Sequence, residues 1–263
     1  MTQYIEDRRE AYIQTIRLTR ADKKNALAPE MYEAIAEALR SAQNDRKVRV
    51  TIVTGSGDSF TAGNDVGGFA ARSNAPTDGN SVSQAPSPFS AFLAALMAAE
   101  KPVIAAVNGL AVGIGVTMLP HCDLVYAADN ARFSMPFVNL GIVPEAGSTI
   151  LMPQLMGRQR AMEMFLLGDP FDANTAKQTG LVNAIFPADR LMQEVLAIAG
   201  RLAAKPPSAL RETKRLVREH GALLDNAIND EGGTIAAQLR TPESREAIKA
   251  FMERRPADFS QFN

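Results

Sequence analysis

The chain has 263 residues, of which 46% are hydrophobic and 22% charged, as expected for a soluble globular protein of one or two domains. Its 28 basic and 29 acidic side chains give a net charge of −1, which argues against a nucleic-acid or anionic-membrane partner. The single cysteine, Cys122, excludes an intrachain disulfide, and its apolar surroundings favour a buried, inert thiol. Because His121 and His220 are far apart in the sequence, we expect no metal site.

Targeting signals are absent from the sequence. The first residues lack the apolar core of a signal peptide and the Arg/Ser bias of a transit peptide. No apolar run approaches the roughly 18 residues that span a bilayer. The final residues, Ser-Gln-Phe-Asn, differ from a peroxisomal address of the Ser-Lys-Leu type. The sequence therefore predicts a soluble, cytoplasmic protein without membrane contact.

The N-terminal part alternates between predicted strands and a helix. Residues 12–18 mix β-branched and polar side chains and predict a strand, which a polar turn at 20–25 follows. Alternation over residues 48–52 predicts a second strand, which leads into a glycine-rich loop at 55–65. Between the strands, Pro29 opens a predicted helix. The apolar positions of that helix are Met31, Ile35, Leu39 and Ala42.

The central part contains a long polar segment followed by two more predicted strands. Residues 70–88 are rich in Ser, Asn, Pro, Thr, Asp and Gly, which predicts a long mobile loop of the kind that forms a lid or stays disordered. After a helix around 91–99, residues 103–107 and 124–127 predict short strands. Between them, the small residues of 108–115 lead into a helical start.

The C-terminal part is predicted to be mainly helical. Further helices are expected around 208–219, 222–239 and 242–254, after an amphipathic stripe at Leu191, Val195, Ile198 and Leu202. Strands that alternate with helices, followed by a helical end, predict an α/β core with a C-terminal helical extension. Apolar residues of this extension predict a partner chain; they include Leu216, Leu223, Leu224, Ile228 and Ile235.

Two strand-to-loop junctions, at residues 60–65 and 107–115, are rich in small residues. Small residues let backbone N–H groups approach a ligand, and two converging N–H groups form an oxyanion hole. The alternative is a pair of tight turns in an α/β sheet. Neither junction has the Gly-Lys-Ser/Thr of a phosphate loop, and Met118 replaces the third glycine of a dinucleotide fingerprint. A nicotinamide-binding domain is therefore disfavoured.

Glu145 lies among apolar and small residues, an environment that raises a carboxyl pKa and suits a general base. The alternative is a glutamate in a surface loop or at a helix N-terminus. A basic series on one helix face could bind phosphates or lie in solvent, and the same alternatives apply to Arg254 and Arg255. The series consists of Arg211, Lys214, Arg215 and Arg218.

Several motifs, in this order, resemble the crotonase (enoyl-CoA hydratase/isomerase) superfamily over nearly the whole chain. They are residues 25–27, 53–65, 101–109, 113–115, 122–124, 133–136 and 251–256. The resemblance implies a spiral of β-β-α turns over residues 1–200, with the acyl-CoA site, and a helical trimerisation region over 201–263. It also implies an acyl-CoA thioester substrate, a homotrimer or dimer of trimers, and no metal or redox cofactor, since CoA is part of the substrate.

The resemblance also assigns site residues. The backbone N–H groups of Asn64 and Ile114 would form the oxyanion hole that stabilises a thioester enolate. Residues expected to bind CoA or substrate are Lys24, Ala26, Ala62, Gly63, Asp65, Val66, Phe251 and Arg254.

The acids distinguish among the reactions of the superfamily. Typical hydratases carry glutamates where this sequence has Thr117 and Phe137, neither of which can transfer the required proton. The Pro-Glu pair that ends at Glu145 resembles the peroxisomal-type Δ3,Δ2-enoyl-CoA isomerases, in which that glutamate is the sole base. The expected reaction is therefore a 1,3-proton shift from 3-enoyl-CoA to 2-enoyl-CoA, with Asp65 as the alternative base.

Other functions stay open at this stage. Another reaction of the superfamily, such as hydration of an unusual enoyl-CoA or thioester hydrolysis, is the first alternative. A non-catalytic acyl-CoA-binding or scaffold protein is the second, and a nucleotide-dependent dehydrogenase is the third.

Overall fold

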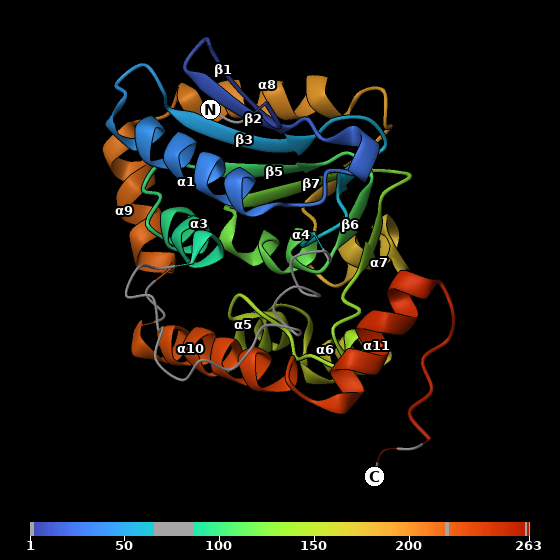
Figure 1. Cartoon of the computed structure of the whole chain (residues 1–263). Helices are drawn as coiled ribbons and strands as arrows, with labels where there is room; N and C mark the ends of the chain where they lie inside the picture. The colour runs from blue at the N-terminus through green and yellow to red at the C-terminus, as the bar shows by residue number, and fades with distance from the viewer. Residues whose placement is uncertain (1–2, 66–86, 219–220, 261, 263) are drawn as a thin grey trace.

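A computed structural model describes residues 3–65, 87–218, 221–260 and 262 of the chain. The fold is mixed α/β, and its larger sheet contains six strands in which only the β1–β2 pair is antiparallel (Figure 1). In spatial order the strands are β1 (Ile5–Glu10), β2 (Ile13–Leu18), β3 (Val50–Gly55), β5 (Val103–Val107), β7 (Leu124–Ala128) and β10 (Ala184–Phe186).

A smaller sheet lies beside the larger one and repeats its order. Its strands are β4 (Ser59–Thr61), β6 (Leu110–Val112), β8 (Arg132–Ser134) and β9 (Phe171–Asp172). Strands β4, β6 and β8 are parallel neighbours, and each follows a strand of the larger sheet, namely β3, β5 or β7. The chain thus steps between two sheets in repeated β-β turns, which confirms the expected crotonase-like spiral.

Helices cover both faces of the larger sheet. Helices α1 (Pro29–Asn44) and α3 (Pro88–Met97) pack together on one face, and α8 (Leu191–Ala203) covers the other (Figure 1). The other helices of the described residues are η1 (Ala21–Lys23), α4 (Ile114–Thr117), η2 (Leu119–His121), η3 (Val138–Leu140), α5 (Ser148–Met156), α6 (Arg158–Leu167), α7 (Ala173–Gln178), α9 (Pro207–Val217), α10 (Gly221–Gln238) and α11 (Pro242–Glu253).

The hydrophobic core is built from the apolar side chains that recur periodically along these helices and strands. The predicted helical stripe of α1 is fully buried, and Pro29 occupies its first turn. On the other face, Val195 and Ala199 of α8 pack in a second cluster with Val50 and Ile104. Burying an aliphatic side chain contributes about 1.5–3 kcal/mol, so the two clusters hold the sheet in place from both sides.

The structure corrects several expected boundaries. The four predicted strands are present, but β1 and the short strands β4, β6, β8, β9 and β10 were not expected. Strands of two or three residues are too short to show a period of two, and β1 is mostly exposed. Of the loop expected at 70–88, residues 70–86 lie outside the described residues. Pro88 instead opens α3, and the Ser87 side chain caps that helix.

The C-terminal helices cover some of their apolar residues with the same chain. Leu224 is buried, and Ile228 and Ile235 pack against the main core. Leu216 and Leu223 are 61% and 59% exposed. The expectation that all five residues need a partner is therefore wrong for three of them. Within the described residues, no helix is both long and apolar enough to cross a bilayer.

Candidate active site

The two small-residue junctions meet at one edge of the smaller sheet. Strands β4 and β6 are parallel, so the segments that follow them emerge side by side. A Cβ atom on Gly63 would lie 2.8 Å from the Val112 carbonyl oxygen, and one on Gly115 would lie 2.6 Å from Thr61 Cγ2. Side chains at these glycines would force the junctions apart, so the glycines allow the close approach.

Each junction presents a backbone N–H group. The Leu27 N–H donates to Gly63 O at 2.8 Å, and the Asp65 N–H donates to Leu27 O at 3.0 Å. Because this parallel bridge uses the groups on either side of Asn64, the Asn64 N–H points away from it. Ile114 is the first residue of α4, where an N–H has no acceptor inside the helix.

Most of the predicted CoA-binding residues form one group. The Ala62 N–H donates to Lys24 O at 2.9 Å. The Arg20 guanidinium donates to Ala26 O at 3.0 Å and to Asp65 at 2.8 Å. Arg20 precedes η1 and thereby joins Ala26, after η1, to Asp65, after β4, so five of the eight predicted residues lie together.

Three of the predicted residues are not part of this group. Val66 lies outside the described residues. Phe251, at the end of α11, is 58% exposed, and Arg254 is exposed beside it. No hydrogen bond or ion pair of the described residues joins either to residues 24–26 or 62–65. Arg255 pairs instead with Glu246 and Glu253, so it serves a structural role in this end of the chain.

The carboxyl group of Glu145 contacts the first junction through the side-chain amide of Asn64. Its carboxyl group is buried, with the residue 7% exposed, so the surface-loop alternative is wrong. The Asn64 amide donates from Nδ2 to Glu145 Oε1 at 3.2 Å. The Tyr32 hydroxyl of α1 donates to Asn64 Oδ1 and thereby fixes the amide orientation. The residue that offers a backbone N–H therefore also binds the carboxyl group.

The turn after Glu145 is tightly held. Ala146 and Gly147 both have left-handed backbone angles, with φ of 65° and 69°. His121 Nε2 lies 2.7 Å from Ala146 O. From α10, the Glu231 carboxylate accepts the Gly147 N–H at 2.6 Å, the Thr149 N–H at 3.0 Å and the Thr149 hydroxyl. These contacts offset the cost of the unusual angles and fix Glu145 relative to α5.

The electrostatic environment suits a general base. Burial, followed by the nearby charge of Glu231, raises the pKa of Glu145 to about 8, while the Asn64 hydrogen bond opposes the rise. Burial also raises the pKa of Glu231, against the hydrogen bonds from Thr149 and Gly147. Glu145 can thus exchange a proton near neutral pH, as a catalytic acid–base group must.

Thr117 and Phe137, at the positions of the hydratase glutamates, are both buried. The Phe137 ring lies about 3.9 Å from where a Cβ of Gly113 would be, so an apolar ring borders the second junction. Thr117 Oγ1 and Ser148 Oγ are buried without a hydrogen-bond partner in the described structure. Glu145 is therefore the only carboxyl group among these three positions.

Sequence reasoning missed the residues that support Glu145. It assigned Asn64 a backbone role only, although the amide side chain offered a further donor. Tyr32 directly follows Met31 of the predicted apolar stripe, which gave it no separate signal. Glu231 lies 86 positions after Glu145 in the sequence (231 − 145), and no local pattern links them. Only the packing of α10 against α5 brings the two carboxyl groups together.

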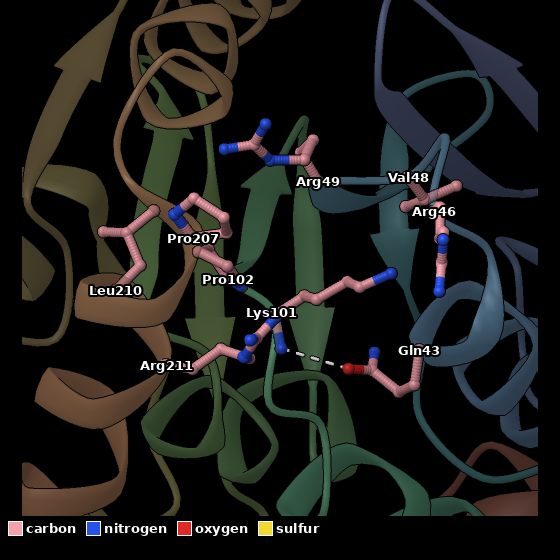
Figure 2. Close-up of a pocket in the computed structure, with 9 residues that line it drawn as sticks. All are labelled: Gln43, Arg46, Val48, Arg49, Lys101, Pro102, Pro207, Leu210 and Arg211. Carbon is pink, nitrogen blue, oxygen red and sulfur yellow. Dashed lines mark hydrogen bonds between the residues drawn. The ribbon is translucent and has the colours of Figure 1, made fainter.

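The basic series is largely structural. Lys214 and Arg218 pair with Asp123 at 2.7 Å and 3.1 Å, so neither the phosphate-binding nor the solvated alternative holds for these two. Arg215 forms an exposed pair with Glu212. Arg211 lines a cavity of about 290 Å³ beside the amino ends of β3 and β5 (Figure 2). This cavity is separate from the junctions that follow β4 and β6.

Two sequence-based expectations concern cysteine and metal chemistry. Cys122 is buried as predicted, and burial raises its thiol pKa to about 12, which makes it unreactive. In the described part of the chain, no three His, Cys, Asp or Glu side chains gather in a way that could hold a metal ion.

Comparison with known proteins gives the class. A family model described as enoyl-CoA hydratase/isomerase matches residues 8–262, so the chain belongs to this family. A structure of OdaA from Pseudomonas aeruginosa is similar, with 43% identity, a TM-score of 0.89 and coverage of 96% of this chain and 100% of that one. An enoyl-CoA hydratase/isomerase from Pseudoalteromonas atlantica has 35% identity, a TM-score of 0.90 and coverage of 98% and 100%.

The relatives with assigned names include isomerases and hydratases. Enoyl-CoA delta isomerase 2 of Rattus norvegicus is 36% identical over 94% of this chain, which spans only 63% of that protein. The 2,3-dehydroadipyl-CoA hydratase of Escherichia coli is 32% identical, over 95% of this chain and 96% of that protein. Similarity alone therefore assigns the family and leaves the reaction to the site.

Proposed function

We propose that this protein is a Δ3,Δ2-enoyl-CoA isomerase. The observation that carries the proposal is the placement of one buried carboxyl group, Glu145, within hydrogen-bond distance of the Asn64 side chain. The two positions at which hydratases carry glutamates hold Thr117 and Phe137. A 1,3-proton shift needs one base that serves two carbons in turn, whereas addition of water usually needs a second group.

In the proposed mechanism, the thioester oxygen accepts hydrogen bonds from the backbone N–H groups of Asn64 and Ile114. Glu145, as the carboxylate, removes a proton from C2 of a 3-enoyl-CoA, and the C–H electron pair forms a dienolate. The same carboxyl group returns the proton to C4, and the double bond moves between C2 and C3. Removing one donor of this kind typically costs about 3–4 kcal/mol in activation free energy, so the two N–H groups and the base must act together.

Hydration is the second candidate, and the similar hydratases support it. Crotonyl-CoA hydratase of Syntrophomonas wolfei is 34% identical, with 95% of both chains covered. The side chains at positions 117 and 137 oppose this candidate, because neither a threonine hydroxyl nor a phenyl ring is an effective acid or base near pH 7.

One assay separates the two reactions. A single preparation is given 3-hexenoyl-CoA and, separately, 2-hexenoyl-CoA, and ultraviolet spectroscopy follows gain or loss of the conjugated enoyl thioester. We expect rapid conjugation of the 3-enoyl substrate and little hydration of the 2-enoyl substrate. Efficient hydration with negligible isomerisation would instead establish the second candidate, and inactivity with both would favour a binding protein.

We also propose that the protein works as a homotrimer or dimer of trimers in the cytoplasm, without a metal or redox cofactor. The exposed Leu216 and Leu223 support this assembly, because water-exposed leucines near the α9–α10 connection favour association. Light scattering at micromolar concentration should give at least three times the 28.3 kDa chain mass. A mass of one chain would contradict the assembly and leave the reaction untouched.

A further inference from the structure

The N-terminus of α5 is capped by a carboxylate from another helix. Its own N-cap residue is Gly147, which has no side chain to accept the free N–H groups. Glu231 of α10 takes that role: Oε2 accepts the Gly147 N–H at 2.6 Å, and Oε1 accepts the Thr149 N–H at 3.0 Å. The Thr149 hydroxyl donates to the same Oε1 atom. These three donors and the positive end of the helix dipole favour the ionised carboxylate and oppose the effect of burial, which raises the pKa of Glu231.

The capping carboxylate also acts on Glu145 through its charge. Glu231 and Glu145 are 5% and 7% exposed, and after burial the charge of Glu231 is the next cause that raises the pKa of Glu145. Other polar groups reach the turn indirectly, since His121 of η2 contacts Ala146 O and Tyr32 of α1 contacts Asn64. Among the described residues, neither glutamate forms an ion pair with a cation.

Buried like charges without a cation are costly, and a purely structural cap would not need them. A neutral Ser, Thr or Asn side chain at position 147 could cap α5 without a second buried carboxylate. However, Gly147 has φ of 69°, and a Cβ there would lie 2.5 Å from Leu224 Cδ1 of α10. The left-handed angle of Gly147 and the approach of Leu224 disfavour a capping side chain at this position, and Glu231 of α10 provides the cap instead.

We propose that Glu231 is a positioning residue for Glu145, because it holds the turn that carries the base and keeps a negative charge beside it. This inference rests on the proposed role of Glu145. It means that a C-terminal helix, remote in sequence, controls both the orientation and the basicity of the reacting carboxyl group. The Glu231 charge favours the protonated form of Glu145, so removal of this charge lets Glu145 ionise at lower pH.

The test compares Glu231→Gln with the wild type and with Asp230→Asn. Asp230 is exposed and precedes Glu231 on α10, so its variant removes an equal charge from the same helix. The carboxyl carbons of ¹³C-labelled glutamate are titrated by NMR, and the Glu145 signal is the one absent from Glu145→Gln. We expect the titration midpoint of Glu145 to fall by at least about half a pH unit in Glu231→Gln. In Asp230→Asn the midpoint should equal that of the wild type.

The pH dependence of turnover gives the second readout. In Glu231→Gln the acid limb of kcat/KM should move to lower pH, and the plateau should fall about tenfold because the turn is less firmly held. A lower plateau with an unmoved acid limb and NMR midpoint would show a merely structural cap and overturn the proposal. Equal shifts in Asp230→Asn would also overturn it, because they would reveal a general field effect.

A second variant keeps the test valid should Glu231→Gln fail to fold. Thr149→Val preserves the side-chain shape and removes one donor to Glu231, so it disfavours the Glu231 charge. The NMR midpoint of Glu145 should then fall in the same direction by a smaller amount, and an unchanged midpoint would contradict the proposal. Full activity of Glu145→Gln would instead refute the proposed function, whatever the Glu231 variants show.

Discussion

Two regions of the protein bring like charges together in the interior, and they differ in whether an opposite charge lies beside them. In one, Lys214 and Arg218 of the α9 segment converge on the carboxylate of Asp123, which also accepts the Val103 N–H at 2.7 Å. In the other, Glu145 and Glu231 converge with hydrogen-bond donors and no cation among the described residues. Burial lowers the pKa of Lys214 to about 8 and, with Glu231, raises that of Glu145 to the same value.

The difference shows that burial alone does not make a reactive group. The Asp123 charge opposes the effect of burial on Lys214, so an ion pair holds α9 against the start of β5. The Glu231 charge adds to the effect of burial on Glu145, so that carboxyl group gains a proton easily. A perturbed group whose charged partner strengthens the perturbation has the raised pKa expected of a catalytic base.

The strongest test of this difference between the two regions is to replace Glu145, the proposed base. Glu145→Gln keeps the size and a hydrogen-bond acceptor for Asn64 but cannot take a proton. We expect isomerase kcat to fall by at least about 10²-fold, while acyl-CoA binding changes little. Steady-state kinetics with 3-hexenoyl-CoA and calorimetric binding of a saturated acyl-CoA measure the two effects. Near-wild-type turnover would assign the base elsewhere, with Asp65 the first residue to replace.

The basic region should respond in stability rather than in catalysis. Asp123→Asn leaves Lys214 and Arg218 close together without a counter-charge, and we expect a loss of about 2–4 kcal/mol in unfolding free energy. Urea unfolding at pH 7 measures this loss. Activity per folded molecule should stay within about twofold of the wild type. A catalytic defect larger than the folding defect would show that the two regions are coupled.

A pH titration of stability sharpens the contrast. Because the folded-state pKa of Glu145 is about 8, above its ordinary value of 4.5, the folded protein binds a proton that the unfolded chain has released between these values. Stability should therefore decline as pH rises from about 5 to 8, by up to about 1.4 kcal/mol per pH unit from this group. Urea unfolding of Glu145→Gln should show a flatter profile, and identical slopes in both proteins would contradict the assignment.

The sequence predicted the parts of the fold and site that local pattern controls. The strands at 103–107 and 124–127, the α1 stripe and the two glycine junctions each depend on neighbouring residues. Strands as short as β6 and β10 depend on pairing partners far along the chain, so they showed no period. Resemblance to a family identified Glu145, whereas composition around it could not distinguish a base from a surface residue.

The sequence could not predict the residues that position Glu145, for a related reason. Tyr32, Asn64, Glu145 and Glu231 come from α1, the segment after β4, the turn before α5, and α10. Their hydrogen bonds exist only because these four segments pack together in the folded chain. Each residue has an ordinary local setting, such as an aromatic in a helix or an acid between polar residues. Site chemistry of this kind becomes visible only in three dimensions.

The smallest expected effect concerns the outer end of this hydrogen-bonded chain. Tyr32→Phe removes the hydroxyl that donates to Asn64 Oδ1 but keeps the ring that packs against Phe89 and Phe92. The freed amide can rotate away from Glu145, and we expect kcat to fall about three- to tenfold with little change in melting temperature. Tyr126→Phe, a buried tyrosine of β7 beside Phe186, is the matched control and should leave kcat unchanged. Equal kcat in both variants would show that Asn64 holds its orientation without Tyr32.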